Sequence, residues 1–183
     1  MQTSLLQLKE KLLKLGALRP IAWDAIQEQI RETSLKANES FIRLPGQIAY
    51  VVDGILKEYD AHLRKKPAII NFLGTDEFIL THQFSQRHYL KACIDTQILS
   101  ISREHVLSLQ TTFPELLRLY IPISISYYES SFNRQYLLEI KSVPDRIARF
   151  KEQFHTHLKY LRLKDIANYL NINYDYLSLH YRN

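Results

Sequence analysis

The chain has 183 residues, of which 46% are hydrophobic and 23% charged, and its net charge is +5. These values are typical of a globular protein with one large or two small domains. No run approaches the length of about twenty apolar residues that a membrane span needs. The opening MQTSLLQLKEKLLKLG contains Lys and Glu where a signal peptide is apolar, so we expect a cytoplasmic protein. The single cysteine, Cys93, excludes an internal disulfide and a cysteine-only metal or iron-sulfur site.

Two helices are predicted at the start of the chain. Apolar and charged residues alternate at helical spacing from residue 4 to residue 33. Pro20 can open the second helix, which we expect to run to about Glu32. Its Trp23, Ile26 and Ile30 share one side. This pattern indicates a helical pair that packs on a sheet.

From about Ser34 to Ser102 the spacing of apolar residues changes to that of strands. Short apolar runs are separated by turn residues, and the pair Asp53-Gly54 predicts a tight hairpin between two of them. Short strands joined by tight turns indicate an antiparallel β-roll or barrel. The predicted strands are Phe41–Leu44, Ile48–Val52, Ile55–Tyr59, Ala68–Phe72, Tyr89–Ala92 and Gln97–Ser102.

Two helices are predicted after the roll. The first begins at Ser102, and the second starts from a capping pattern at Thr112, is interrupted near Pro122 and then runs from about residue 123 to residue 141. This long central helix can offer a free face to a second copy or pack entirely within its own chain. The stripe considered for that face is Ile123, Tyr127, Ser131, Arg134 and Leu138.

A break at Ser142 divides the chain into predicted domains of residues 1–141 and 142–183. The second domain opens with a helix from Arg146 to about Tyr160, whose apolar stripe can support the end of the chain. From Glu139 to the end, eight Lys or Arg residues stand against five Asp or Glu residues. This excess is moderate and is compatible with an approach to phosphate.

The last stretch, from Leu161 to Asn183, is predicted to form a helix-turn-helix. Ala167 leaves room where the two helices cross, and Asn171 can adopt the left-handed conformation that the turn needs. Asn173 is expected to cap the second helix, with Asp175 in its first turn. An ordinary helical hairpin that closes a domain is the alternative interpretation.

At these positions the segment resembles the DNA-binding end of the Crp/Fnr family of bacterial transcription regulators. The matching residues are Leu163 to Ala167, Tyr169-Leu170 and Leu177-Ser178. Asn171 departs from the usual Gly, and Leu179 replaces an Arg that the family commonly aims at a base. The resemblance implies an α+β fold, with an N-terminal antiparallel β-roll like a cyclic-nucleotide-binding domain, flanking helices, a long central helix and a C-terminal winged helix-turn-helix. A wing would have to fit near Lys159 to Arg162.

The resemblance also locates an effector pocket in the roll. Nucleotide-binding members use a Gly-Glu pair and a later Arg, whereas Leu80-Thr81 and Gln86 stand at those places here, with His88 beside them. Arg87 would point outward, since neighbouring strand residues face opposite ways. We therefore expect no cofactor and no usual cyclic-nucleotide site, although an active cyclic-nucleotide receptor is a further hypothesis.

The family's way of binding places the second helix of the motif in the major groove of double-stranded DNA. It implies a homodimer through the central helix, a nearly palindromic site, and RNA polymerase as a further partner. We find no P-loop, HExxH or CxxC motif and expect no enzyme activity and no metal site. A competing hypothesis is a small-molecule or partner-binding sensor with a degenerate DNA-binding end. The expected DNA-contacting residues are Arg162, Lys164, Asn173, Tyr174, Asp175, Ser178, Leu179, Tyr181 and Arg182.

Overall fold

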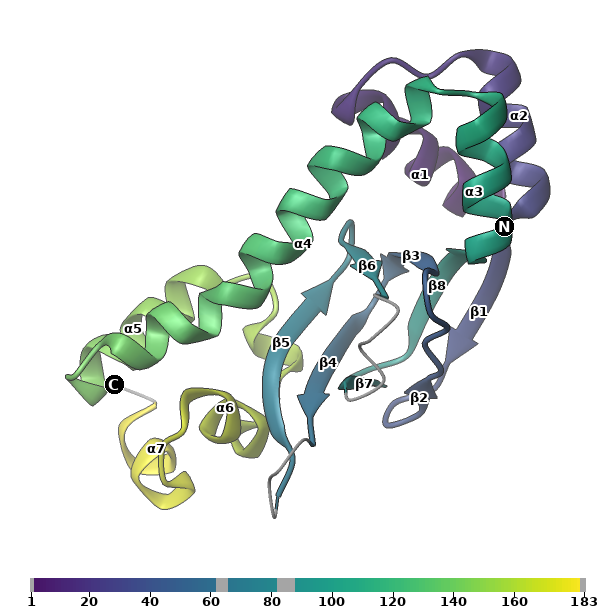
Figure 1. Ribbon diagram of the computed structural model, residues 1–183. Helices are drawn as coiled ribbons and strands as arrows, with labels where there is room; N and C mark the ends of the chain where they lie inside the picture. Colours follow the sequence, from purple (N-terminus) through teal and green to yellow (C-terminus); the bar gives the residue numbers. More distant parts are fainter. Residues whose placement is uncertain (1, 62–65, 82–87, 182–183) are drawn as a thin grey trace.

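The computed structural model describes residues 2–61, 66–81 and 88–181. Its strands form two antiparallel four-stranded sheets that together make a roll (Figure 1). The first sheet has the order β1 (Arg31–Leu35), β8 (Thr96–Ile101), β3 (Ile48–Asp53) and β6 (Phe78–Leu80). The second has the order β2 (Ser40–Phe41), β7 (His88–Ala92), β4 (Ile55–Asp60) and β5 (Ala68–Gly74). The predicted antiparallel β-roll is confirmed.

The helices gather at the two ends of this roll (Figure 1). Three of them lie together near one end: α1 (Gln2–Leu15), α2 (Pro20–Gln29) and α3 (Arg103–Thr112). The long helix α4 (Glu115–Glu139) runs diagonally from there past the roll to the C-terminal helices. Those are α5 (Val143–Gln153), the short 3₁₀ helix η1 (Leu158–Tyr160), α6 (Leu163–Leu170) and α7 (Tyr174–His180).

The turn at Asp53-Gly54 exists, but the predicted hairpin was wrong. β3 pairs with β6 and β8, whereas β4 pairs with β5 and β7, so the turn carries the chain from one sheet to the other. Gly54 has a φ of +108°, and a Cβ there would lie 2.7 Å from the Cα of Thr96. The corner therefore needs glycine.

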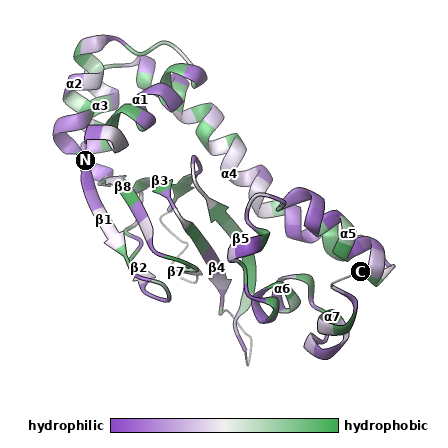
Figure 2. Cartoon of the chain, turned by 180° about the vertical axis from the view of Figure 1, so that it is seen from behind, coloured by the Kyte–Doolittle hydropathy of each residue, from purple (hydrophilic) through white to green (hydrophobic). Residues whose placement is uncertain are grey.

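Strands β4 and β5 are covered on both faces, which explains their continuous burial. Leu56 and Leu73 belong to a first apolar core, which fills the roll and extends to the helices around α1. Ile55 and Phe72, on the opposite face, belong to a second core shared with the C-terminal helices. Figure 2 shows β5 and part of β4 in green, the colour of hydrophobic residues.

The second core includes residues from both sides of the expected boundary at residue 142, among them Ile55 and Leu137 as well as Phe150 and Leu177. The division into two domains stays a prediction, but the C-terminal helices are packed firmly on the outer face of the second sheet. Among the described helices, none combines the length and apolar character that crossing a membrane requires.

The sequence predicted an interruption near Pro122, but helix α4 passes through this proline without a break. Leu119 and Ile123 lie on either side of this proline and are both buried in the first core. Their burial stabilises the helical path although Pro122 cannot donate a backbone hydrogen bond. Tertiary packing here outweighs local propensity.

Three other boundaries differ from the predictions. Helix α2 ends at Gln29, because β1 starts at Arg31 to pair with β8. The helix expected to reach Tyr160 ends at Gln153. The next residue, Phe154, has a non-helical backbone conformation. The segment in which a wing would fit contains η1 rather than a hairpin. The chain therefore reaches α6 by a compact turn.

Candidate functional site

The helix-turn-helix forms as the sequence predicted. Asn171 ends α6 and adopts the left-handed conformation, with φ 53° and ψ 48°. Its backbone N–H donates to the backbone oxygens of Ala167 and Asn168 in α6. Asn173 caps α7, because its side-chain oxygen accepts from the N–H groups of Asp175 (2.7 Å) and Tyr176 (3.2 Å). Two local hydrogen-bonding residues thus fix where each helix ends and begins.

A small apolar core holds the two helices together. Ile166, Leu170 and Leu177 are completely buried, and Ala167 lies among them at the crossing. This is the shared core that the spacing of these residues predicted. With the apolar side of α7 turned inward, its polar side faces away from the protein.

The outer side of α7 is exposed to solvent, and most of the expected DNA-contacting residues lie there or just before α6. Leu179 is 73% exposed and Tyr174 is 40% exposed. Lys164 places its ammonium group 5.7 Å from the centre of the Tyr174 ring, which links the two helices at the surface. The exposed members of the expected set are Arg162, Lys164, Asn173, Tyr174, Asp175, Ser178 and Leu179.

Of the other two expected residues, Tyr181 does not present its hydroxyl on this surface. The hydroxyl oxygen of Tyr181 is buried without a hydrogen-bond partner, and its backbone oxygen accepts from Lys151 at 2.6 Å. Burial raises the pKa of Tyr181. A side chain held in this way does not present its hydroxyl to a phosphate. Arg182 lies outside the described residues.

Polar contacts that the sequence analysis missed attach the helix-turn-helix to the roll. Lys57 on β4 forms a 2.7 Å ion pair with Asp165 on α6, and both side chains are largely buried. The side chain of Asn168 accepts from the N–H of Ile69 at 2.7 Å and donates to the oxygen of Pro67 at 3.1 Å. A lysine inside an apolar strand such as β4 is the one local sign of this attachment.

Two further contacts complete the attachment. The ring of His157 packs so closely on β5 that a Cβ at Gly74 would lie 2.8 Å from its Cδ2 atom. Arg134 on α4 donates to the backbone oxygen of Tyr169 at 2.8 Å. The position of α7 is therefore set by both the roll and the long helix.

A buried side chain of the protein lies in the roll beside Leu80 and Thr81. Arg43 donates to the oxygen of Leu80 at 2.6 Å and to the hydroxyl of Thr81 at 3.1 Å. The same guanidinium forms a 2.5 Å ion pair with Glu58, and the two side chains are 4% and 2% exposed. The place expected for an effector therefore holds a buried arginine whose partners come from the protein.

This ion pair also reaches α4. Tyr127 accepts a 2.8 Å hydrogen bond from Arg43 and donates a 3.2 Å hydrogen bond to Glu58. Burial, reinforced by the nearby Glu58 carboxylate, raises the pKa of Tyr127 above its usual range. Burial alone would lower the pKa of Arg43, but the attraction of Tyr127 and Glu58 outweighs it and the pKa is raised. Gln86 and the side chain of His88 lie outside the described residues.

Much of the α4 stripe considered for dimer contacts faces inward, although its Ser131 is exposed. Ile123 and Tyr127 are buried in the first core, and Arg134 is bonded to α6. The opposite side of the helix carries the exposed apolar residues, each about half exposed and spaced by three or four positions. They form an outer stripe of Leu117, Ile121, Ile125, Tyr128, Phe132 and Tyr136.

The described residues contain no group of His, Cys, Asp and Glu side chains able to hold a metal ion. Burial raises the pKa of the Cys93 thiol to about 12. The thiolate, which is the reactive form, is therefore disfavoured at neutral pH. His155 is exposed and contacts only the backbone oxygen of Glu152 among its described partners.

No protein-family model and no curated protein matches the sequence. Solved structures match the fold. FixK2 from Bradyrhizobium japonicum is 17% identical with a TM-score of 0.69, and the match covers 84% of this chain and 83% of that chain. A protein described as a transcriptional regulator of the Crp/Fnr family from Eubacterium rectale is 14% identical with a TM-score of 0.70, covering 90% and 82%. The c-di-GMP-responsive global regulator CLP from Xanthomonas campestris is 13% identical with a TM-score of 0.67, covering 90% of each chain. The chain thus shares the fold of Crp/Fnr regulators, as the resemblance implied.

Proposed function

We propose that this chain is a sequence-specific DNA-binding transcription regulator of the Crp/Fnr type. The observation that carries the proposal is the exposed outer side of α7, held on a helix-turn-helix whose turn and cap are fixed by Asn171 and Asn173. An exposed second helix of this motif can enter a major groove by its N-terminal end. Such a regulator would act on double-stranded DNA in the cytoplasm.

Each polar residue on this surface suits a particular part of DNA. Ser178 can contact several base edges, and Asp175 can accept from a cytosine. Leu179, at 73% exposed, can pack only against a thymine methyl. Arg162 and Lys164 suit phosphates, which fix register and carry no sequence information. We therefore expect an interface with many contacts to the phosphate backbone of the DNA and few strong contacts to its bases.

The outer stripe of α4 supports a homodimer. From Leu117 to Tyr136 it spans roughly 28 Å at the rise of an α-helix, and its spacing matches that of helices that pack along a seam. A second copy that packs on this stripe, related by a twofold axis, would place the two α7 helices at the same end of the dimer. The proposed site is then nearly palindromic, with half-sites about one helical turn apart. RNA polymerase is a further proposed partner.

The roll is not proposed to use the usual cyclic-nucleotide site. Arg43, Glu58 and Tyr127 satisfy one another within the pocket. A nucleotide entering there would have to break a buried ion pair, and truncating one partner of such pairs costs about 3–5 kcal/mol. Calorimetry with cyclic AMP and cyclic GMP should show no binding, and a tight complex with either nucleotide would refute this part of the proposal.

Selection from a random DNA library tests the main proposal. The full chain, immobilised by a tag, should enrich duplexes that carry two related half-sites in inverted order. The variant Ser178→Glu, which adds a negative charge on the outer side of α7, should abolish enrichment, whereas Glu152→Gln on α5 should leave it intact. Failure of the wild-type chain to enrich any sequence would contradict the proposal.

A second candidate function is a partner-binding or small-molecule sensor whose helix-turn-helix does not bind DNA. The observation in its favour is Leu179, which leaves an exposed apolar side chain where the family commonly has an Arg. A guanine contact worth about 1–3 kcal/mol is then missing. This candidate predicts that the selection experiment returns only random sequences.

A further inference from the structure

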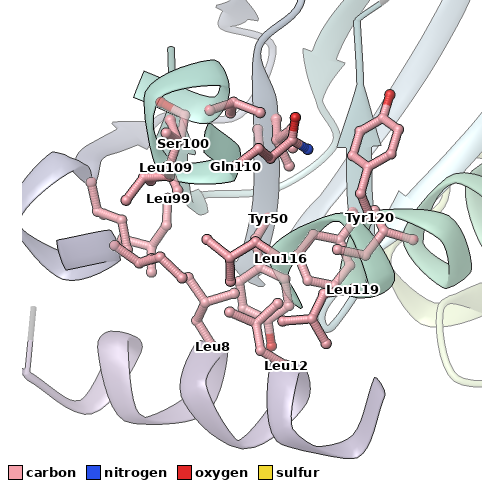
Figure 3. A pocket seen from close by; sticks show the side chains of 18 residues that line it. Leu8, Leu12, Tyr50, Leu99, Ser100, Leu109, Gln110, Leu116, Leu119 and Tyr120 are labelled. Carbon is pink, nitrogen blue, oxygen red and sulfur yellow. The ribbon is translucent and has the colours of Figure 1, made fainter. Parts of the chain in front are cut away.

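An apolar cavity lies outside the roll, between the first sheet and the helices that cover it. Its volume is about 90 Å³. The strands β3 and β8 form one wall, and α1, α3 and the beginning of α4 form the others (Figure 3). Protein cores contain few voids larger than a water molecule. A cavity of this size between several elements of the fold is therefore a candidate binding site.

The chemistry of the wall is almost entirely aliphatic. Leu8 and Leu12 come from α1, Leu109 from α3, and Leu116 and Leu119 from α4, and Figure 3 shows them around one space. None of the described residues that line the cavity carries a charge. Water in such a cavity finds few hydrogen-bond partners, and a small apolar molecule gains contacts by entering it.

Few polar atoms are available to an occupant. The hydroxyl of Tyr50 already bonds to Asp76. Ser100 on β8 alternates with Leu99 and Ile101, so its side chain lies on the opposite face of the sheet. Gln110 on α3 and Tyr120 on α4 are half-buried and line the cavity. These groups can serve one hydroxyl, whereas a carboxylate would lose its water without gaining a cation.

We propose that this cavity binds a small uncharged apolar molecule, of about the size of a six-carbon ring with at most one hydroxyl group. The occupant must be this small, because the volume of about 90 Å³ is below the roughly 150 Å³ of an apolar cavity that binds benzene. This site is separate from the roll interior that Arg43 fills, and it does not depend on DNA binding. An occupant would touch Leu116 and Leu119, which begin the helix that carries the outer stripe.

The proposal is tested by nuclear magnetic resonance of the full-length protein with labelled methyl groups. Benzene and phenol, added up to their solubility, should give saturable shifts in the methyl groups of Leu8, Leu109 and Leu119. The methyl groups of Ile147 and Leu170, which belong to the second core, should not move. Benzoate, which has the same ring and a negative charge, should give no saturable shift.

Variants that fill the cavity separate binding in it from binding elsewhere. Val106→Phe places a larger side chain in the lining from α3, and Ile30→Phe does so from the end of α2. Each should reduce the affinity for benzene by at least tenfold. Leu107→Phe is the matched control, because Leu107 is the next residue of α3, is 51% exposed and does not line the cavity.

The two filling variants come from different elements, so that one remains if the other fails to fold. Undiminished benzene binding in a folded filling variant would overturn the proposal. So would the absence of saturable shifts in the wild type, or equal binding of phenol and benzoate. Each of these results concerns only the cavity and is independent of the selection experiment on DNA.

Discussion

Arg43 in the roll donates a 2.8 Å hydrogen bond to the hydroxyl of Tyr127 on α4. This contact joins the pocket of the roll to the long helix, and Glu58 bonds to both residues. Arg43 thereby lies beside Leu80 and Thr81, where the resemblance implied an effector pocket. These hydrogen bonds hold the long helix on the roll.

We predict that Arg43→Met destabilises the protein by about 3–5 kcal/mol, because it leaves the Glu58 carboxylate buried without its cation. Tyr127→Phe should cost about 1 kcal/mol, the usual net value of a hydrogen bond. Urea denaturation followed by circular dichroism measures both. The control Tyr160→Phe, at a residue that is 41% exposed and lies outside the outer stripe of α4, should leave the free energy of unfolding unchanged. Wild-type stability in Arg43→Met would refute the role of this network.

We predict that the ion pair of Lys57 and Asp165 couples the roll to the helix-turn-helix. Asp165→Asn should cost about 3 kcal/mol, since Lys57 then stays buried without a negative partner. The double variant Lys57→Met, Asp165→Leu should recover most of this loss, and a double-mutant cycle gives the coupling energy. The exposed pair of Arg149 and Glu152 is the control and should show almost no coupling. Equal coupling energies for the two pairs would contradict the prediction.

His157 is predicted to make stability depend on pH. Burial lowers the pKa of this ring below its ordinary value. The unfolded chain therefore binds the proton more readily, so the stability due to the neutral ring is fully present above about pH 6.5 and is lost as the pH falls. Between about pH 7.5 and about pH 5.5, His157→Gln should lose less unfolding free energy than the wild type. His180→Gln, at an exposed histidine on α7, should behave like the wild type. Equal losses in all three proteins would be the contrary result.

The outer stripe of α4 is predicted to hold two copies together. Ile125→Glu and Phe132→Glu place charges in the middle of the stripe, and each should convert a dimer into a monomer. Ser126→Glu adds the same charge beside the stripe and should leave the dimer intact. Sedimentation velocity gives the mass of each protein. A monomeric wild type, or dimers in all three variants, would disprove this arrangement.

Local features of the sequence predicted the helix-turn-helix well. Asn171 and Asn173 act through their own backbone and that of their neighbours, so their roles do not depend on distant residues. The same holds for the turn at Asp53-Gly54, whose position was right. The predicted pairing of the two strands that flank this turn was wrong, because turn residues do not indicate whether the next strand stays in the same sheet.

Features that depend on distant residues could not be predicted. Helix α4 carries apolar residues on two sides, and only the folded chain shows that Ile123 faces the core while Ile125 faces solvent. Two of the partners of Arg43, Glu58 and Tyr127, are 15 and 84 positions away in the sequence. Nothing close to Arg43 in the chain reveals that it fills the pocket, since surface arginines are far more common.

The central claim is tested most directly by a fluorescence anisotropy titration over a range of salt concentrations. The wild-type chain is added to the duplex obtained by selection and to a scrambled duplex of equal length. We predict binding to the selected duplex that is at least about a thousandfold tighter than to the scrambled one, and a steep loss of affinity as salt increases. Equal affinity for both duplexes, or no binding at low salt, would contradict the claim that α7 recognises DNA.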